Sequence, residues 1–292
     1  MKFEQATQRD RDCLAGLRAS AWAKELSPQE FSERNKLLYA HPFGQKRIQT
    51  FLLRDKSGEI VSSMDALEVK LFFRAPLTQE VQNREGFLIA SVITPENQRA
   101  KGYATQLLQN FLSHQKWDLG VLYSDIGAPY YERFGFKKTP TSVFEVQGFE
   151  SNSKPKLKIL SLEAWVEKVF QRRKENFENN VKAQVALLPE TEFLDWQLER
   201  FRYFFRLTRA GVLPPCFYEC ETPQGARYFA VVHNPVTQGA EILWREPDCP
   251  EIFSFIASVV QGWGLKKYSY WSSGKETGLP GRKVHEECPM GW

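Results

Sequence analysis

A strand that runs into a helix across a basic turn is the feature that most constrains the fold of this chain. Residues 93–112 read ITPENQRAKGYATQLLQNFL. An apolar run at 86–93 comes before the turn, and apolar residues recur at helical spacing over 101–115. In layered domains, a helix of this kind packs back on the sheet that its strand belongs to. We therefore expect an α/β structure.

The turn from Gln98 to Ala104 has the composition of an anion site. A helix N-terminus presents unpaired backbone N–H groups and a partial positive charge. The small residues Gly102 and Ala104 allow a ligand to approach the backbone closely, and Arg99 and Lys101 add positive charge. This pattern predicts a loop that binds a pyrophosphate.

The whole chain reads as two α/β halves, each with mostly antiparallel strands, joined by the linker-like stretch GFESNSKPKLK. Ser27-Pro28-Gln29-Glu30 has the form of a capping box that opens a helix. The other elements expected in the first half are a strand at 2–6, a helix at 9–24, a hairpin with its turn at 55–58, a polar loop at 74–85, strands at 86–93, 120–123 and 136–146, and helices at 101–115 and 128–134. Those expected in the second half are helices at 161–176, 190–208 and 250–262, and strands at 217–221, 228–233, 241–245 and 267–272.

Composition argues against several classes of function. The net charge of +4 is small for 292 residues, and the basic stretches at 154–158 and 172–174 read as solvated faces rather than a nucleic-acid site. The five cysteines lack C-x-x-C spacing, and the four histidines lack metal-site spacing, so we expect reduced cysteines and no metal. No apolar run approaches the roughly 18 residues of a membrane span. We expect a cytoplasmic protein without a membrane or nucleic-acid partner.

Two motifs in the first half resemble those of a known superfamily. The spacing R-x-x-G-x-A after a strand and Pro95 resembles the acetyl-CoA pyrophosphate loop of the GCN5-related N-acetyltransferases (GNAT). Downstream, YYERFGF at 130–136 resembles the second signature, a short helix ending in YxxxGF. The longer stretch VLYSDIGAPYYERFGF is similar to fungal lysine N6-acetyltransferases, which also carry a C-terminal domain. The first-half match covers residues 1–147, and the looser C-terminal match rests on DWQLERFRYFF and the closing CPM.

The resemblance implies a fold and a domain plan. It implies an α/β (α+β) GNAT fold with a central mixed, mostly antiparallel sheet over residues 1–148. Residues 156–292 would form a degenerate GNAT-like α/β domain without the pyrophosphate loop. Its counterpart turn, LWREPDCPEIFSF, has no glycine and places Asp248 and Glu251 at a helix start, where they would repel a pyrophosphate.

The resemblance also assigns acetyl-CoA as cosubstrate. Backbone N–H groups at a bulged strand end, residues 91–93, would polarise the thioester carbonyl, with the donor near Val92 or Ile93. The residues expected to bind the cosubstrate are Val92, Ile93, Gln98, Arg99, Ala100, Lys101, Gly102, Tyr103, Ala104 and Tyr130.

Acyl transfer to an amine needs an acid and a base. Tyr131 matches the family tyrosine whose phenol, with a pKa of about 10, protonates the leaving thiolate. A lysine amine has a pKa of about 10.4, so a carboxylate must take its proton. Asp125 in YSDIG is the preferred base, although it equally suits a helix cap, and Glu85 is the second candidate. Asp65 and Glu68, on the strand that would flank the substrate groove, are further carboxylates.

The predicted function is acetyl transfer from acetyl-CoA to a primary amine, with the side chain of free lysine or a similar small amino acid as first choice. A polyamine, an aminosugar or a protein lysine is the alternative acceptor, and a non-catalytic CoA-binding regulator is the alternative class. An arginine such as Arg202 or Arg206 would hold the carboxylate of an amino-acid substrate. The second half either serves as a wall or contributes polar and aromatic groups, drawn from Trp196, Glu199, Tyr203, Trp244 and Trp271. The acyl chain length and the oligomeric state stay open.

Overall fold

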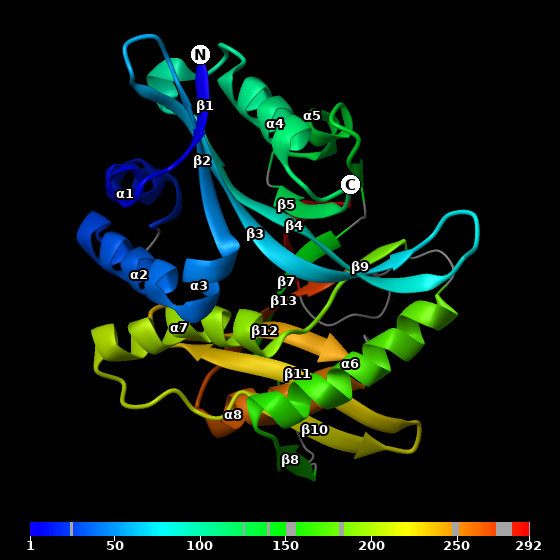
Figure 1. Ribbon diagram of the computed structural model, residues 1–292. Coiled ribbons are helices and arrows are strands. Elements are labelled where there is room, and N and C mark those ends of the chain that lie inside the picture. The colour runs from blue at the N-terminus through cyan, green and yellow to red at the C-terminus, as the bar shows by residue number, and fades with distance from the viewer. Residues whose placement is uncertain are drawn as a thin grey trace. The chain divides into compact units, whose positions relative to one another are not determined.

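The computed structural model describes residues 1–23, 26–124, 126–138, 141–149, 156–180, 184–246, 251–272 and 282–291 (Figure 1). The chain divides into two compact units. The first unit comprises Met1–Leu71, Arg84–Lys138 and Pro289–Trp292, and the second comprises Phe72–Asn83 and Thr139–Cys288. Both units are therefore discontinuous in sequence, whereas the predicted domains, 1–148 and 156–292, are single segments.

The first unit is built on strands in the order β1-β2-β3-β4-β5. The pairs β1–β2 and β2–β3 are antiparallel, and β4–β5 is parallel because a helix crosses over between the two strands. Its elements are β1 (Lys2–Gln5), α1 (Gln8–Trp22), α2 (Pro28–Ala40), α3 (Pro42–Arg47), β2 (Ile48–Arg54), β3 (Ile60–Arg74), β4 (Val81–Ile93), the 3-10 turn η1 (Glu96–Gln98), α4 (Tyr103–His114), β5 (Gly120–Ser124), α5 (Ala128–Glu132) and β6 (Lys137–Lys138).

Helices cover both faces of this sheet (Figure 1). Side chains alternate along a strand, so neighbouring residues serve opposite faces. Phe51 on β2 packs on Phe111 of α4, with ring centroids 5.2 Å apart. The adjacent Thr50 faces the other side of the sheet, where its hydroxyl donates to Asp65 of β3. Residues of α1 and α2 also donate to this carboxylate.

A buried ion pair fastens α1 and α2 to their face of the sheet. Arg18 donates to both carboxylate oxygens of Asp65 at 2.7 and 3.0 Å, and the two residues are only 4% and 6% exposed. The hydroxyls of Tyr39 and Thr50 also donate to Asp65. Burial and the neighbouring Asp65 carboxylate raise the pKa of Tyr39 to about 12. One buried carboxylate thus joins two helices and two strands.

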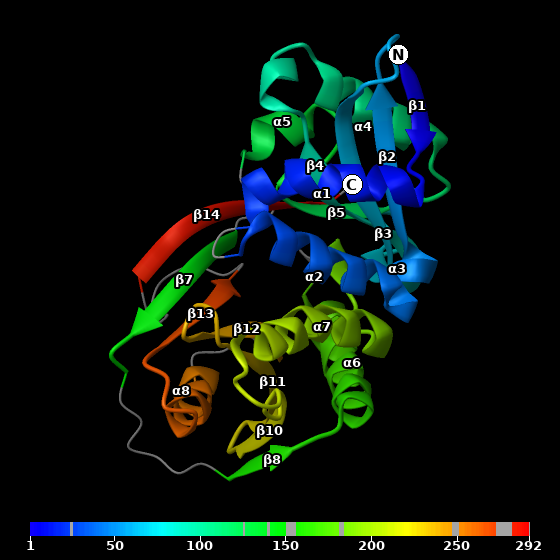
Figure 2. The same ribbon diagram turned by 90° about the vertical axis from the view of Figure 1, so that its left-hand side faces the viewer.

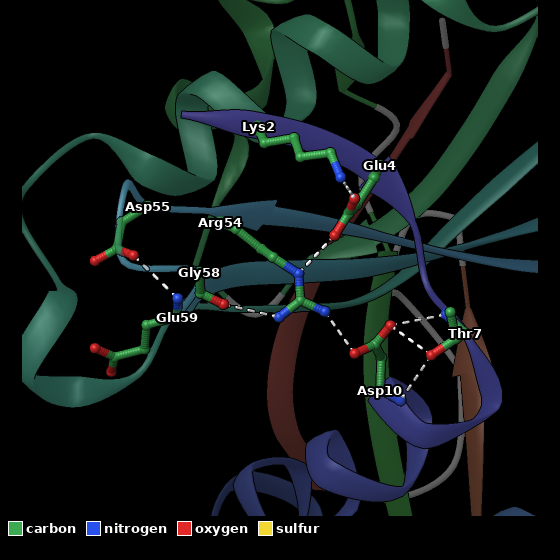
Figure 3. A network of polar contacts seen from close by, with 8 residues as sticks. All are labelled: Lys2, Glu4, Thr7, Asp10, Arg54, Asp55, Gly58 and Glu59. Carbon is green, nitrogen blue, oxygen red and sulfur yellow. Dashed lines mark hydrogen bonds and ion pairs between the residues drawn. The ribbon is translucent and has the colours of Figure 1, made fainter.

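A second polar network surrounds Arg54 at the end of β2 (Figure 3). Its guanidinium donates to Glu4 on β1 and to Asp10 in the first turn of α1, at 2.5 Å in each case. It also donates to the carbonyl of Gly58 in the β2–β3 turn at 3.0 Å. The side chain of Asp10 completes the capping box of α1 with Thr7. Arg54 therefore connects the first strand, the first helix and the hairpin turn.

The network shifts both carboxyl groups toward the ionised state. Hydrogen bonds from Lys2 and Arg54 lower the pKa of Glu4 from its ordinary 4.5. Burial alone would raise the pKa of Asp10, but hydrogen bonds from Thr7 and Arg54 outweigh burial and lower it from 3.8.

The second unit repeats the element order of the first. A strand and two helices come before three successive antiparallel strands, and α8 then crosses over to a parallel strand, β13. Figure 2 shows α6 and α8 on opposite sides of the strands of this unit. Its elements are β7 (Thr141–Gln147), β8 (Leu157–Ile159), α6 (Leu162–Asn179), β9 (Val185–Leu187), α7 (Thr191–Thr208), β10 (Phe217–Thr222), β11 (Gly225–Asn234), β12 (Gly239–Glu246), α8 (Ile252–Gly262), β13 (Lys267–Ser272) and the main part of β14 (Arg282–Gly291).

The predicted α/β class with a mixed, mostly antiparallel sheet is confirmed. The capping box at Ser27 is present, with Ser27 and Glu30 bonding each other's backbone N–H groups. The hairpin turn at 55–58 and the strand Lys267–Ser272 also agree with the prediction.

The polar loop predicted over 74–85 is wrong, because β3 continues to Arg74 and β4 begins at Val81. The tip of the β3–β4 hairpin is in contact with residues about 100 positions later in the sequence. Arg74 donates to the carbonyls of Phe177 and Glu178 at the end of α6, and Phe72 stacks on Phe177. The single strand predicted over 136–146 is replaced by β6 and β7. The prediction also missed α3, β8, β9 and β14.

Membrane-spanning helices and metal clusters were sought in the described part of the chain. None of its helices is long and apolar enough to cross a membrane. Its His, Cys, Asp and Glu side chains form no cluster that could hold a metal ion. Cys13, Cys216 and Cys220 are free thiols. Cys249 lies outside the described residues, and so does the side chain of Cys288.

We predict that Asp65→Ala lowers the free energy of unfolding by about 3–5 kcal/mol, because it leaves Arg18 buried without its anion. Denaturant titration of the purified variant measures this loss. The control is Glu68→Ala on the same strand. Glu68 pairs with the exposed Lys116 at 3.6 Å, so its loss should cost at most about 1 kcal/mol. Equal losses in the two variants would contradict the role given to the buried pair.

We predict that the stability lost in Arg54→Gln depends on pH. The folded-state pKa values of Glu4 and Asp10 are lowered, so their contribution is present above about pH 4.5 and disappears as the pH falls through those values. Urea titrations of wild type and variant at pH 7, 5 and 3 should show a difference that shrinks toward pH 3. A loss that is constant across this range would assign the effect to the Gly58 hydrogen bond and packing instead.

Candidate functional site

The end of β4 departs from regular strand geometry. Among the described residues, the parallel register of β4 and β5 runs from Phe87↔Gly120 to Ile89↔Leu122 and stops there. Two residues later Ser91 has a φ of 54°, which is rare for a residue with a side chain and typical of a bulge. The strands therefore part at the segment 91–93, where the sequence predicts the carbonyl-polarising N–H of Val92 or Ile93.

Helix α4 begins without a side-chain cap. Its N-cap residue, Gly102, has a left-handed φ of 80°, and a Cβ built there would meet no protein atom within 4 Å. The first intrahelical hydrogen bond runs from the N–H of Gln106 to the carbonyl of Gly102. The N–H groups of the three residues between them therefore have no acceptor within the helix. Such a helix end is suited to bind an anion.

The turn before α4 is exposed and predominantly basic. Ala100 has a φ of 62°, so two of its residues are left-handed. Lys101 donates to the side chain of Gln98 at 2.9 Å. Arg99 lies 3.5 Å from Glu96 and donates to the carbonyl of Thr94 at 3.4 Å. These side chains stay near the first turn of α4, where Tyr103 and Ala104 follow.

Helix α5 presents the two predicted tyrosines. Tyr131 is 5% exposed and meets Tyr130 and Phe136 edge-on, at centroid distances of 4.9 and 6.1 Å. Among the described residues the buried hydroxyl of Tyr130 has no hydrogen-bond partner. Arg133 lies over the Tyr130 ring at 4.3 Å and donates to the hydroxyl of Thr105 at 2.8 Å. Because Thr105 is in the first turn of α4, Arg133 connects the two helices that carry the predicted site.

The structure describes one of the two predicted bases, Glu85. Asp125 itself lies outside the described residues, and its neighbour Ser124 is the last residue of β5. Glu85 is exposed on β4, six residues before Ser91. At the usual rise of a strand this places Glu85 roughly 20 Å from the point where the strands part. The position of Glu85 is therefore unfavourable for direct proton transfer at residues 91–93.

The other carboxylates considered from the sequence already have cationic partners. Asp65 is bound by Arg18, and Glu68 pairs with Lys116.

In the second unit, Arg202 pairs with Asp195 and Glu199, and Arg206 also pairs with Glu199.

The sequence also suggests four aromatic residues of the second unit for the substrate site. Trp196 stacks on Phe193, with ring centroids 5.9 Å apart. Tyr203 is 7% exposed, and Trp244 lies under the guanidinium of Arg173 at 4.9 Å. The side chain of Trp271 is outside the described part of the chain, as is all of Asp248.

The second unit has its own parallel crossover, and an arginine occupies it. The register of β12 and β13 is limited to Ala240↔Tyr268 and Glu241↔Ser269 among the described residues. Farther along β12, Arg245 lies over the rings of Phe253 on α8 and Tyr270 on β13, at 5.2 and 4.8 Å. Arg245 thus packs between the end of β12 and the two elements that follow it, α8 and β13.

Comparisons with known proteins agree with this geometry. A GCN5-related N-acetyltransferase from Kribbella flavida has a TM-score of 0.63 at 12% identity, over 99% of this chain and 71% of that chain. A probable N-acyltransferase from Enterococcus faecalis V583 has a TM-score of 0.60 at 16% identity, over 99% of this chain and 72% of that one. This chain has the GNAT fold.

The sequence comparisons match a smaller part of this chain than the structural ones do. A lysine acetyltransferase from Yarrowia lipolytica is 26% identical over 161 residues, which are 45% of this chain and 40% of that relative. No protein-family model matches the chain. This chain also aligns with N-myristoyltransferase from Saccharomyces cerevisiae with bound myristoyl-CoA, at a TM-score of 0.56 and 12% identity. The alignment covers all of this chain and 79% of that one.

Proposed function

We propose that this chain is an N-acetyltransferase that transfers the acetyl group of acetyl-CoA to a primary amine. The observation that carries the proposal is the junction at which β4 parts from β5 and the uncapped α4 begins at Gly102. Its unpaired N–H groups, with Arg99 and Lys101 nearby, match the charge of a CoA pyrophosphate. Related folds act on acyl-CoA, as the myristoyl-CoA complex illustrates.

The chemistry follows from the two sides of the junction. A backbone N–H of Val92 or Ile93 polarises the thioester carbonyl and stabilises the negative charge that develops on its oxygen. The amine attacks the carbonyl carbon, and the C–S bond breaks. Tyr131 gives its phenolic proton to the departing thiolate, which leaves as the free thiol.

The amine must lose its extra proton before it attacks. Asp125 is the proposed base, since it directly follows β5, whose end diverges from β4. Glu85 is the less favoured candidate because of its distance along β4.

Free lysine, acetylated on its side-chain amine, is the proposed acceptor. Support comes from the similarity to the Yarrowia lipolytica lysine acetyltransferase and from the LYSDIG stretch. Arg202 and Arg206 are both paired with acidic residues of their own helix, which weakens their case as partners of a substrate carboxylate.

We predict that wild type releases CoA thiol from acetyl-CoA when L-lysine is present, and that Tyr131→Phe lowers kcat about 100-fold, as loss of a general acid does. A thiol-release assay should include D-lysine, spermidine and an aminoglycoside as competing acceptors. Tyr228→Phe in the second unit is the matched control and should keep the wild-type rate. If calorimetry shows acetyl-CoA binding but no amine releases thiol, a protein acceptor or a non-catalytic role replaces the small-amine proposal.

We predict that Gly102→Val weakens acetyl-CoA binding about tenfold or more, equivalent to about 1.4 kcal/mol. A valine there is strained at a φ of 80° and puts its side chain into the open space beside the loop. Gly58→Val is the control, because Gly58 has a φ of 87° and equally open surroundings. Calorimetry should show an unchanged dissociation constant for Gly58→Val, and equal weakening of both variants would contradict the assigned loop.

A further inference from the structure

The backbone at the end of β4 is held by a side chain of β3. Ile93 is the last residue of the strand, and its carbonyl accepts a hydrogen bond from the hydroxyl of Ser62 at 3.1 Å. Ser62 is on β3, the neighbour of β4 on the side away from β5. A buried backbone carbonyl needs a partner when its ladder stops, and here a serine hydroxyl provides it.

The same hydroxyl extends the connection to the turn before α4. Ser62 lies 3.1 Å from the hydroxyl of Thr94. A serine has one hydroxyl hydrogen, and Ser62 gives it to Ile93, so Thr94 is the donor in this second bond. The carbonyl of Thr94 in turn accepts from Arg99. A chain of hydrogen bonds thus runs from β3 through the strand end to the basic turn.

The next residue on β3 provides an internal comparison. Ser62 and Ser63 are both 0% exposed, but strand alternation directs them to opposite faces. The hydroxyl of Ser63 has no hydrogen-bond partner among the described residues. A buried polar group without a partner weakens a fold, so the hydroxyl of Ser63 does not stabilise this strand. Two adjacent, equally buried serines therefore face opposite sides of the sheet, and only Ser62 bonds the end of β4.

We propose that Ser62 is a positioning residue that fixes the bulged segment 91–94 and its link to Arg99. This inference rests on the proposed function, because it assigns to that segment the N–H group that polarises the thioester. With Ser62 in place, the φ of 54° at Ser91 and the direction of the following N–H groups are held before any substrate binds. Ser62 touches neither the acyl group nor the amine.

The kinetic test compares Ser62→Ala with Ser63→Ala. We expect Ser62→Ala to lower kcat about tenfold, less than the 10²–10³ that loss of an oxyanion-hole donor itself costs, with KM for the amine nearly unchanged. Ser63→Ala should keep the wild-type kcat, and Ser62→Thr, which retains a hydroxyl, should restore most of the activity. Equal kcat values in Ser62→Ala and Ser63→Ala would overturn the proposal.

A second measurement does not depend on turnover. Hydrogen–deuterium exchange followed by mass spectrometry should show faster exchange over residues 90–100 in Ser62→Ala and an unchanged rate in Ser63→Ala. Thr94→Val, at a partly exposed site, removes the bond between Thr94 and Ser62 and should also speed exchange, whereas Thr94→Ser should not. Unchanged exchange in both Ser62→Ala and Thr94→Val would refute the positioning role. A wild type that lacks transferase activity would instead refute the proposed function, and exchange would still decide the role of Ser62.

Discussion

The parallel pairing of β4 and β5 ends at Ile89 and Leu122, and the candidate site depends on that limit. Beyond it the backbone of β4 must find other partners, because unpaired buried polar groups are costly. The carbonyl of Ile93 turns to Ser62, and Ser91 takes a left-handed conformation. Backbone donors at the strand end and at the start of α4 then become available to a ligand. The candidate site is therefore a local interruption of strand pairing, with a side chain of β3 bonded to its backbone.

Sequence reasoning succeeded where the determinants are local. The Ser27 capping box and the glycine turn before α4 each depend on a few neighbouring residues, so their structures could be predicted. The roles of Asp65 and Ser62 could not, since their partners lie 47 and 31 residues away. The run IVSSMD did carry a signal, because two serines and an aspartate are unusual in a strand this apolar. The unpredicted hairpin tip likewise depends on carbonyls at the distant end of α6.

The second unit has the same element order as the first, and sequence reasoning expects no CoA site in it. Sequence reasoning attributed this to acidic residues at the start of α8, of which Asp248 is outside the described part of the chain. The structure adds an observation at the end of β12, where Arg245 lies over the rings of Phe253 on α8 and Tyr270 on β13. Such an interaction contributes about 0.5–2 kcal/mol, depending on burial. A cationic side chain of the protein thus packs where β12 leads toward α8.

Each unit includes a segment that is distant in sequence from the rest of that unit, and this affects how the protein can be divided into fragments. The hairpin tip Phe72–Asn83 belongs to the second unit, and Pro289–Trp292 belongs to the first. No single cut separates the units, so a fragment ending at the linker would leave the tip without its partners on α6. A fragment that holds one whole unit must therefore join segments from distant parts of the chain.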